Sequence, residues 1–168
     1  MCGVKICGVT SVADAVAAAE LGAAAIGLNF YKKSPRSIDE PTALEIINAL
    51  PKTVVTYMLA VDEPWEETLG RAKRLRFTSW IQVHRTPHLI CPDPSQCWMP
   101  AFPIKDESSL ESIDELLNRC REEGRWAPTA VLVDAHVAGS FGGTGRTAPW
   151  NVVAGWSQSQ SINVVLAR

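Results

Sequence analysis

Two residues at the ends of apolar stretches have side chains able to transfer protons. Cys7 ends the stretch 4–7, and Asp134 directly follows the stretch 130–133. A thiol acts as a nucleophile or base when its thiolate is stabilised, although a lone cysteine is more often a small buried hydrophobe. A carboxylate beside an apolar stretch is unusual because its unpaired burial is costly, and a capping or ion-paired role is the structural alternative. Both residues are therefore candidates for catalysis.

Two further segments have the composition of ligand-binding loops. Residues 139–147 contain glycines at 139, 142, 143 and 145, so their backbone amides can approach an anion. This loop lacks the Gly-Lys-Ser/Thr ending of a P-loop, and a flexible connector is equally consistent. Arg36 ends the segment 30–36, and its planar guanidinium suits two-pronged recognition of a carboxylate. A solvated basic loop is the alternative for that segment.

The sequence also offers four nitrogen and sulfur ligands of the kind that bind zinc, namely His84, His88, Cys91 and Cys97. Their spacing matches no standard zinc pattern. Prolines at 87, 92 and 94 also separate their side chains. We therefore predict that the protein holds no metal.

Seven short apolar stretches alternate with helical patterns along the chain. The stretches are mostly continuous, which is typical of parallel strands covered on both faces. They span residues 4–7, 24–30, 54–61, 80–84, 101–104, 130–133 and 163–167. The helical patterns span 11–21, 41–50, 63–75 and 108–123, with a short fifth at 148–156. Residues 86–103 hold five prolines, which predicts a loop rather than a helix.

This alternation predicts an α/β fold with a parallel sheet. No Gly-x-Gly-x-x-Gly follows the first strand, so a (β/α)8 TIM barrel is favoured over a dinucleotide-binding fold. In a barrel, Cys7, Arg36, Asp134 and the glycine loop would share the active-site face formed by the carboxyl ends of the strands. A complete barrel needs about 200 residues, whereas this chain has 168. We expect a single domain over 1–168, an incomplete barrel in which the eighth strand and the last helices are missing.

Composition excludes several classes of protein. Hydrophobic residues make up 46% and charged residues 20%, which is typical of a globular domain. A net charge of -2 argues against nucleic-acid binding. No apolar stretch approaches the ~18 residues of a membrane span, and the first residues lack a secretory signal. Five cysteines without a Cys-x-x-Cys pair indicate reduced thiols in a cytoplasmic protein.

Four stretches of this chain carry a family resemblance. They read Val-Lys-Ile-Cys-Gly-Val-Thr at 4–10, Ala-Ile-Gly-Leu-Asn-Phe-Tyr at 25–31 with Ser-Pro-Arg at 34–36, Ile-Gln-Val-His at 81–84, and Val-Asp at 133–134 with Gly-Gly-Thr-Gly-Arg-Thr at 142–147 and Trp150. Together they resemble the phosphoribosylanthranilate isomerase family of tryptophan biosynthesis. The similarity runs along the whole chain and is weakest over residues 85–103.

The resemblance implies a reaction and a role for each candidate. The family converts N-(5-phosphoribosyl)anthranilate to 1-(2-carboxyphenylamino)-1-deoxyribulose 5-phosphate, an Amadori rearrangement by general acid–base catalysis without a cofactor. Cys7 matches the general base, Asp134 the general acid, and Arg36 the residue that holds the anthranilate carboxylate. The substrate-binding glycine loop is represented here by Gly142, Gly143, Thr144 and Gly145. The expected partner is a small phosphorylated substrate, and the expected state is a monomer or homodimer.

Three departures from the family pattern leave an alternative open. The family's His-Gly-Asp/Glu after the fourth strand reads His84-Arg85-Thr86 here, and a proline-rich segment replaces the following helix. The phosphate-binding loops that the family has after strands seven and eight have no counterpart. The alternative is a catalytically impaired, truncated relative that acts as a binding or structural piece and associates through open barrel edges. A phosphate-binding module that uses the glycine loop alone is a third interpretation.

Overall fold

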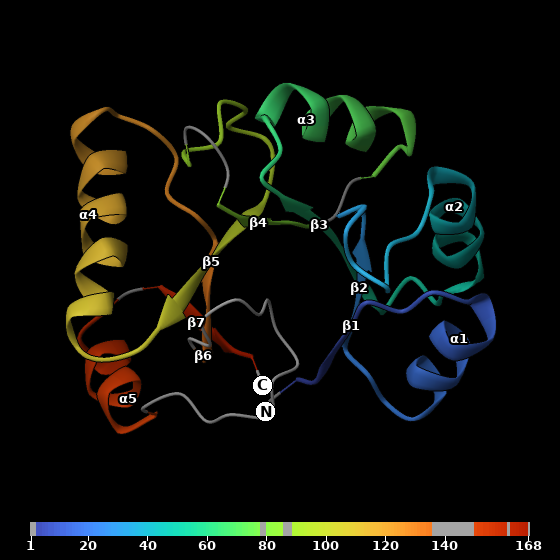
Figure 1. Ribbon diagram of the computed structural model, residues 1–168, viewed down its shortest axis with the longest axis horizontal. Helices are drawn as coiled ribbons and strands as arrows, with labels where there is room; N and C mark the ends of the chain where they lie inside the picture. The colour runs from blue at the N-terminus through green and yellow to red at the C-terminus, as the bar shows by residue number, and fades with distance from the viewer. Residues whose placement is uncertain (1–2, 78–79, 86–88, 136–149, 161, 168) are drawn as a thin grey trace. The chain divides into compact units, whose positions relative to one another are not determined.

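The structure is a computed structural model that describes residues 3–77, 80–85, 89–135, 150–160 and 162–167. The chain divides into two compact units, Met1–Pro87 and His88–Arg168. Strands and helices alternate in both units, and neighbouring strands within each unit are parallel (Figure 1). The predicted α/β class is therefore confirmed.

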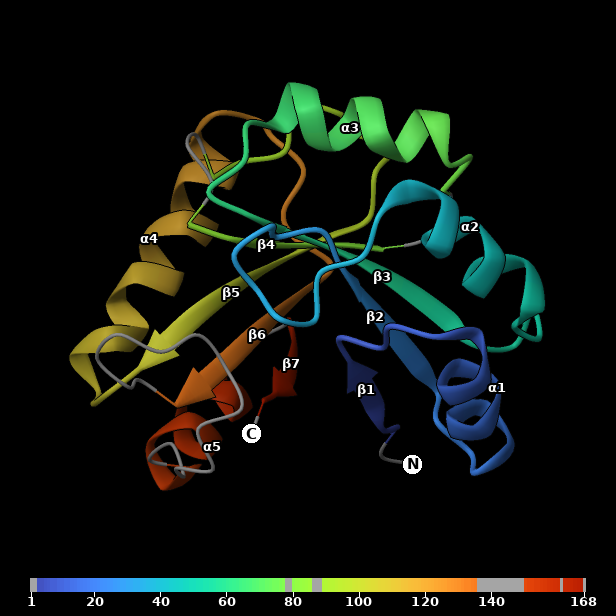
Figure 2. The same ribbon diagram turned by 45° about the vertical axis from the view of Figure 1, so that its right-hand side comes forward.

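Over its described residues, the first unit contains a four-stranded parallel sheet and three helices. In chain order they are β1 (Lys5–Cys7), α1 (Val12–Glu20), β2 (Ala25–Asn29), α2 (Glu40–Ala49), β3 (Val55–Val61), α3 (Trp65–Arg74) and β4 (Trp80–His84). The strands lie side by side in the same order as in the sequence. Figure 2 shows α1, α2 and α3 along one face of this sheet.

The pairing register of this sheet shows which side chains lie on each of its two faces. Residues paired across parallel strands point to the same face, and successive residues point to opposite faces. The helix-covered face holds the fully buried aliphatic side chains Ile26, Leu28, Met58, Ile81 and Val83. The other face carries a row of four residues paired from strand to strand, Cys7, Gly27, Tyr57 and Trp80. The predicted catalytic thiol is therefore on the face that the helices leave open.

Side-chain caps begin the first two helices of this unit. Ser11 Oγ accepts a hydrogen bond from the backbone N–H of Asp14 at 3.1 Å. Asp39 Oδ1 accepts one from the backbone N–H of Thr42 at 3.0 Å. Each cap satisfies a backbone donor that the helix itself leaves unpaired.

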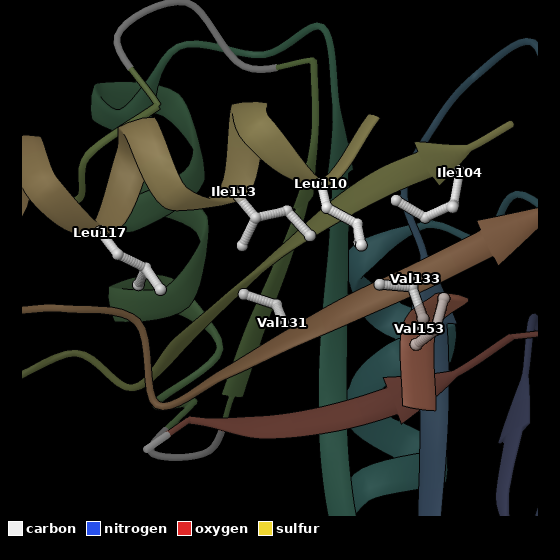
Figure 3. Packing of buried hydrophobic residues seen from close by; sticks show 7 residues of the cluster. All are labelled: Ile104, Leu110, Ile113, Leu117, Val131, Val133 and Val153. Atoms are coloured by element: carbon white, nitrogen blue, oxygen red, sulfur yellow. The ribbon is translucent and has the colours of Figure 1, made fainter. Parts of the chain in front are cut away.

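The described part of the second unit contains a three-stranded parallel sheet and two helices. They are β5 (Trp98–Ile104), α4 (Ser108–Glu122), β6 (Ala130–Ala135), α5 (Trp150–Ser159) and β7 (Asn163–Leu166). Buried aliphatic residues from β5, α4, β6 and α5 form its core (Figure 3), namely Ile104, Leu110, Ile113, Leu117, Val131, Val133 and Val153. A hydrogen bond of 3.0 Å from Trp156 Nε1 to Asp114 Oδ1 joins α5 to α4.

The boundaries of two elements differ from the sequence-based expectation. Strand β5 begins at Trp98 instead of residue 101, so part of the proline-rich segment is strand. Trp98 and Met99 are almost fully buried, and this burial outweighs the backbone donors that Pro100 and Pro103 lack. Residues 89–97 contain no helix, as predicted. Helix α5 runs on to Ser159, beyond the expected end at 156.

Within the described ranges, no helix is both long enough and apolar enough to cross a membrane. The longest helix, α4, has 15 residues and includes several charged side chains.

Candidate active site

Cys7 ends β1, and its half-buried thiol lies against a strand that has no side chain at that point. A Cβ atom added to Gly27 would lie 2.9 Å from Cys7 Sγ and 3.2 Å from Leu59 Cδ1. Contacts under 3.0 Å are essentially never made by Cβ atoms, so the thiol occupies space that only glycine leaves free. Gly27 was not singled out from the sequence, because its contact depends on the register between β1 and β2.

Arg36 follows β2 and reaches back to the end of β1. Its Nη1 donates a hydrogen bond to the backbone oxygen of Cys7 at 3.0 Å. The side chain lies over Gly8, whose φ is 76° and whose added Cβ would lie 3.0 Å from Arg36 Cδ. Glycine is needed at residue 8 both for this left-handed backbone and for the close approach of Arg36. The structure thus brings Cys7 and Arg36, two of the predicted site residues, together.

The loop that carries Arg36 is held by its own hydrogen bonds. Asn29 Oδ1 accepts from the backbone N–H of Tyr31 at 2.9 Å, and Ser34 Oγ accepts from the backbone N–H of Arg36 at 3.2 Å. The backbone N–H of Ile38 donates a hydrogen bond to the backbone oxygen of Asn29 at 2.9 Å. This bond closes the loop. Arg36 itself remains exposed, so the guanidinium donors not used by Cys7 face solvent.

Strand β4 adds a buried polar pair on the same face as the Cys7 row. Gln82 Nε2 lies 2.6 Å from His84 Nε2. Burial, together with the positive charges of Lys5 and Arg85, lowers the pKa of His84 to about 4, so the ring is neutral at pH 7. The Gln82 amide and the neutral His84 ring therefore form a hydrogen bond whose direction depends on the tautomer of the ring.

Gln82 has a further feature. Its side chain is 2% exposed, and its Oε1 is buried without a hydrogen-bond partner among the described residues. From the sequence, we consider His84 as a zinc ligand and predict no metal, and His84 also belongs to the stretch 81–84 that carries the family resemblance. The described residues contain no group of three or more potential metal ligands, and His88 lies outside them. The position two residues before His84 on one strand is the signal that points to Gln82, because such residues share a face.

The two aromatic residues of the Cys7 row lie close to each other and to a positive charge. Lys5 Nζ lies 5.4 Å from the centre of the Tyr57 ring, and the rings of Tyr57 and Trp80 are 5.5 Å apart. Lys5 and Cys7 are two residues apart on β1 and therefore share a face. This face of the first unit combines a thiol, a neutral imidazole and positive charge, which suits a polar, anionic small molecule.

Asp134 belongs to the second unit, where it is half-buried near the end of β6. It is paired in register with Pro103 of β5. Its neighbour Val133 points into the helix-covered core, so Asp134 points to the opposite face of that sheet. The predicted loop residues Gly142, Gly143, Thr144 and Gly145 lie outside the described residues.

Comparison with known proteins gives consistent matches. The family model of N-(5'phosphoribosyl)anthranilate (PRA) isomerase matches residues 4–167. The N-(5'-phosphoribosyl)anthranilate isomerase of Geotalea daltonii is 38% identical over 152 residues, which cover 90% of this chain and 68% of the relative. The crystal structure of phosphoribosyl anthranilate isomerase from Thermotoga maritima matches with a TM-score of 0.78 at 26% identity, and the match covers 99% of this chain and 77% of that one.

A third match has a ligand. A crystal structure of phosphoribosyl anthranilate isomerase in complex with reduced 1-(o-carboxyphenylamino)-1-deoxyribulose 5-phosphate has a TM-score of 0.73 at 24% identity, with 99% of this chain and 75% of that chain covered. These matches confirm the predicted relation to the barrel fold of that family.

Proposed function

The chain belongs to the N-(5'-phosphoribosyl)anthranilate isomerase family, and we propose that Cys7, Asp134 and Arg36 carry out the family's isomerisation in this protein. The enzyme class is that of the aldose–ketose isomerases, and the reaction belongs to tryptophan biosynthesis. One contact carries the assignment of residues, the hydrogen bond from Arg36 Nη1 to the Cys7 backbone oxygen. This bond holds the Arg36 side chain, which can bind a carboxylate, beside Cys7, which can accept a proton. The substrate of the family has both a carboxylate and an acidic C–H.

The rearrangement needs two proton transfers. Asp134 donates a proton to the ring oxygen of the ribose, and the C1–O bond breaks to give an open-chain Schiff base. The Cys7 thiolate then removes the proton from C2, and the resulting enolamine rearranges to the aminoketose. Arg36 binds the anthranilate carboxylate through its remaining N–H donors. The neutral His84 ring lies on the same face as Cys7.

Several finer features belong to the same proposal. Gly142, Gly143, Thr144 and Gly145 contribute backbone donors to the phosphorylated substrate. Residues 1–168 act as one functional domain, without a cofactor or metal and without nucleic-acid or membrane partners. The protein acts as a monomer or homodimer, and the absence of a Cys-x-x-Cys pair among its five cysteines in the sequence supports a cytoplasmic location.

Substitution of the proton-transfer residues tests the proposal. Cys7→Ser and Asp134→Asn should each lower turnover by about 10²–10⁴-fold. Cys97→Ser, at an exposed thiol, and Asp106→Asn, at an exposed carboxylate, are matched controls that should keep wild-type turnover. Full turnover in either site variant would remove that residue from the mechanism. A wild-type chain without turnover would instead favour the catalytically impaired relative.

A further inference from the structure

An arginine on α3 makes a two-pronged ion pair in a mostly buried position. Arg71 Nη1 and Nη2 donate to the two carboxylate oxygens of Glu63 at 2.7 and 2.6 Å. Thr68 Oγ1 donates to the same carboxylate at 2.8 Å. The side chains of Arg71 and Glu63 are only 15% and 16% exposed, which sets this pair apart from ordinary surface ion pairs.

The same guanidinium reaches two other elements. Its Cζ lies 4.8 Å from the centre of the Phe30 ring, and its Nε lies 3.8 Å from Glu40 Oε1. Phe30 directly follows β2, and Glu40 is the first residue of α2. Arg71 therefore contacts both ends of loop 30–39, the loop that carries Arg36.

The charges of this cluster are held in place. Burial raises the pKa of Glu63, but hydrogen bonds from Arg71 and Thr68 outweigh it, and the net pKa is below the usual value. The hydrogen bond from Arg74 is the main cause that lowers the pKa of Glu40. Both carboxylates are therefore ionised at neutral pH, and each keeps its attraction to Arg71.

We propose that Arg71 is a positioning residue for Arg36. By holding Phe30 and Glu40 against α3, it fixes both ends of loop 30–39 and so sets where the Arg36 guanidinium lies over Gly8. This inference rests on the proposed role of Arg36 as the carboxylate-binding residue. It assigns to α3 an indirect influence on substrate affinity, which Arg71 exerts through the position of Arg36.

Arg74 supplies a matched control from the same helix. It donates to Glu40 at 2.6 and 3.1 Å, but its side chain is 59% exposed. Its ion pair holds only the α2 end of loop 30–39. Arg74→Lys therefore changes the same residue type on the same helix without releasing the Phe30 end of the loop.

The first experiment measures binding and catalysis. Arg71→Lys keeps the charge but loses the planar fork. It should raise KM, and the Kd of reduced 1-(o-carboxyphenylamino)-1-deoxyribulose 5-phosphate, by about tenfold, with kcat within about twofold. In an Arg36→Met background the same change should alter neither constant, because Arg71 acts through Arg36. Arg74→Lys should match the wild type.

An equal effect of Arg71→Lys in both backgrounds would overturn the proposal, since it would show a general loss of structure. A fall in kcat with unchanged KM would overturn it as well. The double variant Glu63→Gln/Arg71→Met removes the buried charges together, and it should reproduce the rise in KM if the single variant folds poorly.

The second experiment needs no ligand and separates the two proposals. Limited trypsin digestion, followed by mass spectrometry, should cut loop 30–39 after Lys32, Lys33 and Arg36 about tenfold faster in Arg71→Lys than in the wild type or Arg74→Lys. Unchanged cleavage would overturn the positioning role. Suppose that Arg71→Lys is cleaved faster but the wild-type protein neither binds nor turns over substrate. That result would support Arg71 as the residue that holds loop 30–39. The same result would contradict the carboxylate-binding role proposed for Arg36.

Discussion

At the scale of single residues, two glycines make room for the side chains of the proposed site. Gly8 allows Arg36 to lie across the end of β1, and Gly27 allows the Cys7 thiol to lie against β2. Glycine itself contributes no polar group to either contact, so neither glycine stands out as part of a chemical motif. Their effect is steric, because they decide where reactive atoms of other residues can be.

Gly27→Ala should therefore lower turnover without removing any catalytic group. The new Cβ would lie 2.9 Å from Cys7 Sγ, so the thiol must move. Displacement of a reacting group by a fraction of an ångström to 1 Å costs up to about 100-fold in rate, and we expect kcat to fall roughly 10- to 100-fold. Steady-state kinetics measure this. Gly155→Ala, where no atom lies within 4 Å of the new Cβ, is the control with wild-type kcat.

The chemical residues of the site were predictable from the sequence to different degrees. Cys7 and Arg36 could be named because a thiol at a strand end and an arginine in the following loop are local features. Their mutual contact joins residues 29 positions apart, so it could not be read from either segment alone. The pairing of His84 with Gln82 and its neutral state, which depends on burial, could not be predicted from the sequence.

At the scale of elements, the turns after β3 and β4 have a backbone that their residues do not favour. Asp62 and Arg85 have φ values of 53° and 50°. Their side chains form an ion pair, with exposed fractions of 50% and 45%, and the Asp62 N–H donates to the His84 oxygen at 3.0 Å. By the family resemblance, glycine is expected where Arg85 stands.

Arg85→Gly should stabilise the protein. Left-handed backbone costs a residue other than glycine roughly 1–2 kcal/mol, and an exposed ion pair contributes less than about 1 kcal/mol. We expect the free energy of unfolding in urea to rise by about 1 kcal/mol. Asp62→Asn removes the ion pair alone and should change it by less than about 0.5 kcal/mol. A loss of stability in both variants would show that the ion pair outweighs the backbone cost.

The elements themselves were largely predictable because their patterns are local. Continuous apolar stretches and helical patterns located the strands and most helices in the described part of the chain. The sequence predicts β5 only from residue 101, because Pro100 lacks a backbone donor. In the structure β5 begins at Trp98, since Trp98 and Met99 are 1% and 0% exposed and their burial stabilises the strand. The register that lines up Cys7 with Gly27, Tyr57 and Trp80 arises from pairing between strands, and no single strand encodes it.

At the scale of the whole molecule, the neutral state of His84 ties stability to pH. Its pKa is about 4 in the folded chain against 6.5 for a free side chain. Between these values the unfolded chain binds the proton more readily than the folded one, so acid favours unfolding. The stability linked to His84 is fully present above pH 6.5 and is lost as the pH falls towards 4.

Urea unfolding at pH 7 and pH 4.5 should detect this loss. The wild type should lose roughly 2 kcal/mol more of its unfolding free energy between these pH values than His84→Gln does. The comparison of the two proteins cancels the titration of the carboxylates, which both share. Parallel pH profiles would show that His84 is protonated as easily in the folded chain as in the unfolded one.

The cluster of Phe30, Glu40, Glu63 and Arg71 also bears on how this sequence can change over evolutionary time. A substitution of Arg71 alone leaves the Glu63 carboxylate ionised and mostly buried without its partner, which is costly. A substitution at position 71 is then tolerated only together with a substitution at position 63. Among close relatives, positions 63 and 71 should vary together, while position 74, whose side chain is 59% exposed, should vary independently of them.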